Sequence, residues 1–213
     1  MSEHSEQFGA GFWDERYRSH QAVWSGDPNP QLVAETAELT PGAALDAGAG
    51  EGADAIWLAS QGWHVTAVDW SGVALDRAAA QAAKRGRDVA GRITWLQEDL
   101  TCWDPGAAGY TLVTAQYLHL PPAQREAVLA RLAGAVGPGG TLLIVGHHPS
   151  DLQTTVPRPA MPELFYTGDD IAAALGPSRW AIITNASPAR TATDPHGQTV
   201  TIHDTVLRAV RRP

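Results

Sequence analysis

Short runs of apolar residues alternate along most of the chain with segments whose apolar positions recur at helical spacing. Glycine or proline separates these runs, which is typical of breaks between elements. Continuous apolar stretches such as Thr-Leu-Leu-Ile-Val predict a parallel sheet that helices cover on both faces. Strands are expected at residues 43–47, 64–70, 92–97, 111–115 and 141–146.

The expected helices fall between these strands and begin or end at recognisable signals. Ser71 is a suitable N-cap for an alanine-rich helix, and Gly62 stops the helix before it. Proline at a first helical position opens two others. Helices are therefore expected at residues 8–20, 30–39, 54–61 and 72–84, from 121 or 122 to just before 137, and after a Thr167 cap.

The pattern changes after residue 146. The proline-bearing segment 149–167 is longer than a simple connection. The sequence leaves open whether it is a lid over the acceptor or a loop that only packs on the edge of the sheet. Two β-rich segments, 179–185 and 198–209, are separated by the turn signal Asp194-Pro195-His196-Gly197, which predicts a hairpin. The predicted fold is α/β: a doubly wound, Rossmann-like domain with a mostly parallel seven-stranded sheet, an antiparallel last strand and helices on both faces.

Charge and cysteine content narrow the class of protein. The formal net charge is −8, which argues against nucleic acid and anionic membrane surfaces as partners. No long apolar stretch predicts a membrane span, and the polar, acidic start of the chain differs from a signal peptide. The single cysteine, Cys102, forms no internal disulfide and is expected in or beside the core. These features predict a cytoplasmic protein.

A glycine-rich loop follows the first expected strand. Gly48, Gly50 and Ala53 satisfy a relaxed dinucleotide-binding pattern, so an NAD-type oxidoreductase has to be considered. Asp46 precedes this loop, where its side chain faces the same ligand. A carboxylate repels a pyrophosphate there but attracts the ammonium and sulfonium of a methionine-like ligand. The sign of this charge therefore favours a cationic ligand.

Further acidic residues follow the next two strands. Asp69 ends the second strand, where a carboxylate accepts hydrogen bonds from both ribose hydroxyls. Glu98 and Asp99 follow the third strand, where a carboxylate can accept from an adenine amino group. With Asp46, they predict a crescent of acids at the carboxyl edge of the sheet.

These motifs, in this order, resemble a class I S-adenosylmethionine-dependent methyltransferase. The resemblance covers residues 30–147 most strongly and includes a Gly-Pro-Gly-Gly turn before the fifth strand. The opening Trp-Asp-Glu-Arg-Tyr at 13–17 and Val-Trp at 23–24 are similar to small bacterial members of the tellurite-resistance and thiopurine types. The core of the resemblance is Asp46-x-Gly48-x-Gly50-x-Gly52, Val68-Asp69-Trp70-Ser71 and Glu98-Asp99.

The resemblance implies S-adenosylmethionine as cofactor and assigns residues to it. Asp46 would bind the ammonium, directly or through water, and Asp69 the ribose hydroxyls. Asp99 would lie near the adenine amino group. The remaining implied contacts are Gly48, Ala49, Gly50 and Gly52 along the methionine part, Trp70, Glu98 and Leu100 around adenine, Gln116 by the methionine end, and Tyr17 and Trp24 from the N-terminal cover.

The length of 213 residues suits one domain, and the resemblance makes residues 1–213 a single methyltransferase domain. It would comprise an N-terminal helical cap (1–40), a cofactor-binding core (41–147), and a C-terminal part (148–213) with the lid loop, a helix and the terminal hairpin. The oligomeric state is left open by the sequence.

The methyl acceptor is expected beyond the fourth and fifth strands, because ligands of such sheets bind outside the carboxyl ends. His119 and His147 lie there and are the candidate catalytic bases. No metal is expected, since the adjacent His147 and His148 point to opposite faces. The predicted function is methyl transfer to the S, N or O atom of a small molecule, with a non-catalytic cofactor-binding protein as an alternative.

Overall fold

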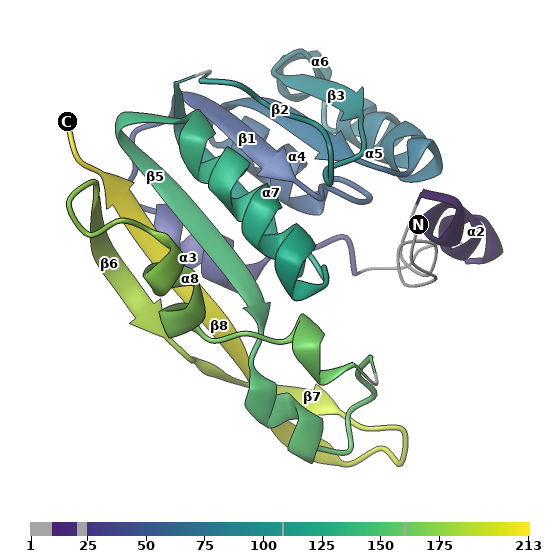
Figure 1. Ribbon diagram of the computed structural model, residues 1–213. Coiled ribbons are helices and arrows are strands. Elements are labelled where there is room, and N and C mark those ends of the chain that lie inside the picture. Colours follow the sequence, from purple (N-terminus) through teal and green to yellow (C-terminus); the bar gives the residue numbers. More distant parts are fainter. Residues whose placement is uncertain (1–9, 21–24, 108, 160) are drawn as a thin grey trace.

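The computed structural model describes residues 10–20, 25–107, 109–159 and 161–213. Its centre is one sheet whose main path has the strand order β3-β2-β1-β4-β5-β8-β6 (Figure 1). The first five strands run parallel, which confirms the predicted α/β fold. They are β1 (Ala43–Ala47), β2 (His64–Asp69), β3 (Ile93–Gln97), β4 (Tyr110–Gln116) and β5 (Val136–His147).

Helices cover both faces of the sheet. One apolar cluster joins the sheet to α3, α4 and α5, and the other joins it to α7 and α8, which lie in front of the sheet in Figure 1. A short helix, α2, packs on α5. The helices are α2 (Ala10–Ser19), α3 (Pro30–Thr36), α4 (Ala53–Ser60), α5 (Gly72–Lys84), α6 (Arg87–Ala90), α7 (Pro122–Ala135) and α8 (Gly168–Ala174), with 3-10 turns η1 (Pro149–Gln153) and η2 (Pro162–Leu164).

Local signals set most helix starts as the sequence predicts. The Ser71 hydroxyl accepts the Ala74 backbone N–H at the start of α5. Thr167 and Asp170 form a reciprocal capping box at the start of α8. The end of α3 was predicted too late: the helix stops at Thr36 rather than at residue 39.

The C-terminal strands correct one prediction. The turn at 194–197 joins β8 (Thr199–Arg211) to an additional strand, β7 (Ala189–Thr193), and not directly to β6 (Trp180–Ala186). Both β6 and β7 pair antiparallel with β8, one after the other along its length. Pro188 lies between them, and proline has no N–H to continue a strand ladder. The sheet therefore has eight strands rather than seven.

The register places β7 beyond the carboxyl edge of the sheet. His147, the last residue of β5, pairs with Asp204 of β8, so residues 199–203 extend past the end of β5. These residues pair with β7, and η1 packs beside them (lower part of Figure 1). The strand that the sequence analysis missed therefore forms a wall where the acceptor was expected.

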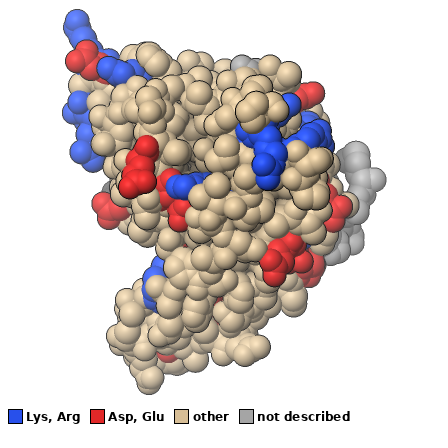
Figure 2. All heavy atoms as spheres, turned by 90° about the vertical axis from the view of Figure 1, so that its left-hand side faces the viewer, with Lys and Arg blue, Asp and Glu red and all other residues tan. Residues whose placement is uncertain are grey.

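Cys102 lies on the surface of the molecule, as do most of the described charged side chains. Cys102 is exposed, contrary to expectation, because it lies in the turn after β3, where its N–H donates to the Asp99 carbonyl. On the face seen in Figure 2, Lys and Arg side chains occur in small groups among Asp and Glu. Each helix within the described ranges is too short or too polar to cross a bilayer.

Candidate active site

Asp46 lies at the end of β1, and strand alternation directs it to the face covered by α4. Its side chain is 1% exposed and accepts a hydrogen bond from the Ala55 backbone N–H. Its Oδ2 atom is buried and has no hydrogen-bond partner among the described residues. A buried carboxylate oxygen without a donor is costly, so this atom marks a place where a ligand donor would be favourable.

The glycine loop turns tightly beside Asp46. Gly48, Gly50 and Gly52 have φ values of 82°, 53° and 81°, which glycine adopts without strain. The backbone N–H groups of Gly48 and Ala49 both donate to the Val68 carbonyl, so the loop is fixed to the end of β2. The glycines were predicted from the sequence, and the loop lies where it was expected.

Asp69 connects this loop to the start of α5. Its carboxylate accepts the Gly50 N–H at 2.8 Å and the Ser71 N–H at 2.9 Å. Each carboxylate oxygen has a second lone pair, so these bonds leave capacity for a hydroxyl donor. Asp69 thus shapes the loop, while its predicted contact with ribose stays a prediction.

Three carboxylates at this edge have raised pKa values. Burial raises the pKa of Asp46 well above its ordinary value, and the negative charges of Asp54 and Asp69 raise it further. Burial also raises the pKa of Asp54 to about 6 and that of Asp69 above its ordinary value. The sequence analysis missed Asp54, although its place in the first turn of α4, directly after the glycine loop, was a usable signal.

The N-terminal helix α2 is attached beside the loop. The Ser71 hydroxyl donates to Asp14 at 2.5 Å, and the Arg77 guanidinium donates to the Tyr17 carbonyl at 2.6 Å. Arg77 also pairs with Glu51 of the loop at 3.0 Å. The structure therefore brings Tyr17, which is buried, near the predicted cofactor residues. Trp24 lies outside the described residues.

The residues predicted around adenine differ in exposure. Trp70 is half-buried, and its Nε1 atom is buried without a partner among the described residues. Leu100 belongs to the core, with Trp70 packed against the same cluster. Glu98 and Asp99 are exposed, and Asp99 accepts two hydrogen bonds from Thr101 within its own turn. Trp70 is thus the candidate here with an unused buried donor.

The ends of β4 and β5 bring the two predicted bases together. The rings of His119 and His147 stack at 5.1 Å between centroids, and Tyr117 stacks on His147 at 4.4 Å. His119 Nε2 and His147 Nδ1 are buried and have no partner in the described part of the chain. Gln116, which the sequence placed by the methionine end, donates to the Thr114 hydroxyl.

Both imidazoles are uncharged at neutral pH. Burial lowers the pKa of His119 to about 4, and the positive charge of Arg158 adds to this effect. Burial lowers the pKa of His147 to about 2, with contributions from Arg158, His119 and Arg190. Each ring therefore retains an unprotonated nitrogen, which can accept a hydrogen bond or a proton.

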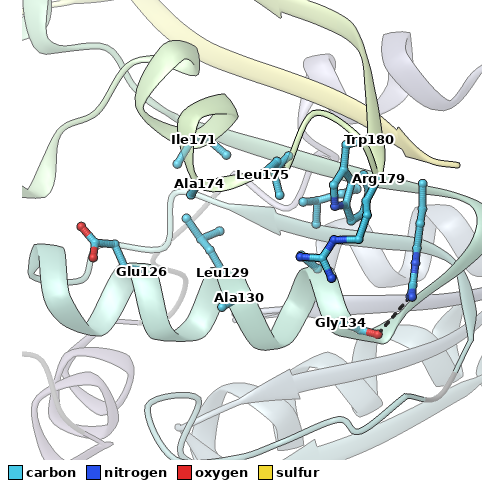
Figure 3. A pocket seen from close by; sticks show the side chains of 13 residues that line it. Glu126, Leu129, Ala130, Gly134, Ile171, Ala174, Leu175, Arg179 and Trp180 are labelled. Atoms are coloured by element: carbon cyan, nitrogen blue, oxygen red, sulfur yellow. Dashed lines mark hydrogen bonds between the residues drawn. The ribbon is translucent and has the colours of Figure 1, made fainter.

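A separate cavity lies between α7 and α8 (Figure 3). Leu129, Ile171, Leu175 and Trp180 form its apolar wall, with Arg179 at its rim. None of the residues predicted to bind cofactor or acceptor lines this cavity. It is therefore not part of the candidate site at the carboxyl edge.

Comparisons with known proteins agree with this geometry. Residues 44–140 match the model of a family described as a methyltransferase domain. This range contains the glycine loop and the acids at the ends of β1, β2 and β3. The match supports the predicted resemblance of this chain to class I S-adenosylmethionine-dependent methyltransferases. The matched family agrees with the predicted one and gives no support to the NAD-type alternative.

Three known proteins are similar to this chain. "Probable thiol methyltransferase 2" of Arabidopsis thaliana is 29% identical over 67% of this chain, and the match spans 62% of that protein's length. Solved structures show the fold. One, described as "Conversion of a Disulfide Bond into a Thioacetal Group during Echinomycin Biosynthesis", has a TM-score of 0.73, 24% identity and coverage of 95% and 91% of the two chains. Another is magnesium protoporphyrin IX methyltransferase of Synechocystis PCC 6803 with bound S-adenosylmethionine. It has a TM-score of 0.58 and 23% identity, and the match covers 84% of this chain and 74% of that chain.

The residues at this edge of the sheet fit S-adenosylmethionine. The cofactor is cationic at its ammonium and sulfonium, and the site offers an unpartnered oxygen of the buried Asp46 near the half-buried carboxylates of Asp54 and Asp69. A Cβ at Gly48 would lie 3.3 Å from Leu118, so the missing side chain keeps the loop open. The individual contacts predicted from the sequence stay predictions.

Proposed function

We propose that this methyltransferase transfers a methyl group from S-adenosylmethionine to the sulfur of a small thiol. The observation that carries the proposal is the pair of uncharged, stacked imidazoles, His119 and His147, beside the strand ends that carry the cofactor motifs. Two of the similar proteins support a sulfur acceptor. The Arabidopsis relative is named as a thiol methyltransferase, and the echinomycin structure concerns the conversion of a disulfide bond into a thioacetal group.

The proposed cofactor contacts follow from the geometry above. S-adenosylmethionine supplies an electrophilic methyl group on a positively charged sulfur. Asp46 would hold the ammonium through its unpartnered oxygen, Asp69 the ribose hydroxyls, and the Gly48–Gly52 loop would line the methionine part. Trp70 would pack near adenine, and Tyr17 would close the site from α2.

The residues of this chain have to bind the acceptor so that a lone pair on its sulfur is free to attack the methyl group. A thiol needs less help than an alcohol because its ordinary pKa is about 8.5. Above a pH of about 4, the His119 ring is neutral, and its unprotonated nitrogen can accept the thiol proton. The thiol sulfur then forms its bond to the methyl carbon as the bond from that carbon to the sulfonium sulfur breaks, which would release S-adenosylhomocysteine. The His147 ring stacks on His119, and the rings of Tyr117 and Phe165 pack on His147, so aromatic contacts shield the imidazole pair from water.

A labelled-methyl assay tests the proposal. The purified protein is incubated with S-adenosylmethionine labelled in its methyl group and with matched thiol, amine and phenol acceptors. We expect labelled thioethers as the main products. Transfer only to amines or phenols would refute the thiol assignment. Cofactor binding without transfer to any member of the panel would favour the non-catalytic alternative.

We also propose that the protein acts in the cytoplasm on a small molecule, without nucleic acid and as one domain. A net charge of −8 and the dispersed Lys and Arg groups in Figure 2 support this proposal. A gel-shift assay with duplex DNA and with RNA at low salt is expected to show no complex. A complex that weakens steeply with salt would contradict the proposal.

A further inference from the structure

Two arginines near the imidazoles are each held by a buried aspartate. Arg158, between η1 and η2, donates to Asp151 Oδ2 from Nη2 at 2.8 Å and from Nε at 3.3 Å. Arg190 of β7 donates from Nε to both oxygens of Asp204, at 2.9 and 3.1 Å. The side chains of both aspartates are 0% exposed. The two guanidinium groups are therefore anchored rather than free to swing into solvent.

Other donors fix the aspartates in turn. Asp151 Oδ1 accepts the His203 backbone N–H at 2.8 Å. Asp204 also accepts the Tyr117 hydroxyl at 2.9 Å and the Gln31 side-chain amide at 3.4 Å. Burying ion pairs is costly and adds little net stability, even when the geometry is good. Two such pairs at one edge of the sheet suggest a role other than stability.

The charge that acts on the imidazoles is positive. Arg158 lowers the pKa of both His119 and His147, and Arg190 lowers that of His147. Among the described residues, the Nη1 groups of both arginines make no hydrogen bond, because their contacts use Nε and Nη2. Asp151 and Asp204 are engaged by their anchoring donors, and the imidazoles carry no charge. The Nη1 groups of the two arginines are therefore hydrogen-bond donors that no carboxylate of the described residues accepts.

We infer that Arg158 and Arg190 form a subsite for a carboxylate on the methyl acceptor, beside the imidazole pair that faces its nucleophile. The inference rests on the proposed function and narrows it to a small thiol acid. Guanidinium groups match carboxylates with paired, charge-assisted hydrogen bonds. The anchoring aspartates hold these donors in place before the acceptor arrives, which lowers the entropy lost on binding.

A binding experiment tests the subsite without turnover. Calorimetry measures the affinity of the protein, saturated with S-adenosylhomocysteine, for (methylthio)acetate and for its neutral isostere (methylthio)acetamide. These thioether products have no thiol to ionise, so only the carboxylate differs in charge. We expect the acid to bind at least about 10-fold more tightly than the amide, a difference of about 1.4 kcal/mol. Equal affinities, or tighter binding of the amide, would overturn the inference.

Variants test which arginine causes the preference for the acid over the amide. Arg158→Gln and Arg190→Gln are each expected to reduce the acid-over-amide preference several-fold and to leave the affinity for the amide nearly unchanged. Because Arg158→Gln leaves Asp151 unpaired, the double variant Arg158→Gln/Asp151→Asn repeats the test without a buried lone charge. Arg179→Gln is the control, because Arg179 is exposed at the separate cavity. A preference that survives in the double variant would overturn the assignment to Arg158.

Turnover distinguishes this inference from the proposed function. Mercaptoacetate and mercaptoacetamide are compared as methyl acceptors, with rates corrected for the fraction of thiolate. If both are methylated equally, the proposed function stands and the carboxylate subsite is wrong. If no thiol is methylated while (methylthio)acetate still binds more tightly than its amide, the subsite stands and the proposal of thiol methylation is wrong.

Discussion

Asp46 precedes the glycine loop and Asp54 follows it, and the negative charge of Asp54 raises the pKa of Asp46. Asp54 accepts the Asn29 backbone N–H at 2.6 Å, whereas Asp46 keeps one oxygen without a donor among the described residues. Two acids of like charge repel each other when both are shielded from water, and here Asp46 is buried and Asp54 half-buried. A bound cation relieves this repulsion, so part of the cation's affinity comes from that relief.

Replacing Asp46 by Asn is expected to weaken cofactor binding and to stabilise the free protein. The Asn oxygen can still accept the Ala55 N–H, while the buried negative charge is removed. We expect the affinity for S-adenosylmethionine to fall about 10- to 100-fold, as for loss of a charged hydrogen bond. Calorimetry measures this change. The exposed Asp88→Asn on α6 is the control and should bind normally.

The stability of the same variant has a definite pH dependence. Because the folded state raises the pKa of Asp46, the charged carboxylate destabilises the fold above its ordinary pKa, and this cost disappears as the pH falls. At pH 7 the Asn variant should therefore melt a few degrees higher than the native protein. The difference should vanish in acid. A lower melting temperature at pH 7 would contradict the assignment of a destabilising carboxylate.

Cofactor affinity should rise with pH around the pKa of Asp54, which is about 6. Above this pH the carboxyl group is charged and attracts the sulfonium, whereas below it the group is neutral. The ratio of S-adenosylmethionine to S-adenosylhomocysteine affinity isolates this effect, because only the first carries the sulfonium charge. We expect the ratio to increase between pH 5 and 7, and the increase to flatten in Asp54→Asn. A ratio independent of pH in the native protein would exclude Asp54.

Gly52→Ala is expected to destabilise the fold by about 1–3 kcal/mol. Gly52 has a φ of 81°, and a Cβ there would lie 2.7 Å from both Ala78 Cβ and the Trp95 ring. Gly139→Ala is the matched control, since Gly139 has a φ of 74° and no described atom within 4 Å of an added Cβ. Urea unfolding of both variants separates backbone strain, which they share, from crowding, which only Gly52→Ala has.

His119→Ala is expected to slow methyl transfer most for acceptors with a high thiol pKa. Since the pKa of His119 is about 4, the ring is already neutral across pH 5–8 and should produce no inflection in the rate there. We expect kcat to fall about 100-fold for an alkyl thiol and less for an acidic aryl thiol. Stopped assays over this series measure both. An equal loss for every thiol would indicate that His119 only positions the acceptor.

Features encoded by neighbouring residues were predictable. The strand β1, the loop glycines and the caps at Ser71 and Thr167 lie where the sequence placed them, because each depends on contacts within a few residues. The gathering of Asp46 and Asp69 followed from the rule that parallel strands end at one edge.

Other features depended on long-range pairing. The hairpin was assigned to the wrong strand, because the pairing of β7 with β8 is decided by the length of β8 and the break at Pro188. Cys102 is exposed because the path of the turn after β3, rather than residue type, sets its surroundings. The ion pair of Arg190 with Asp204 joins β7 to β8, far along the chain from His119 and His147.

The sequence by itself determined the order of the five parallel strands, the flexible glycine loop and the sign of the charge beside it, because periodicity, backbone freedom and formal charge are local properties. Only the tertiary structure decided which acids lose their water, which imidazoles stay neutral and which arginines are anchored. Those outcomes depend on burial and on partners distant along the chain, and both arise only when the sheet is assembled.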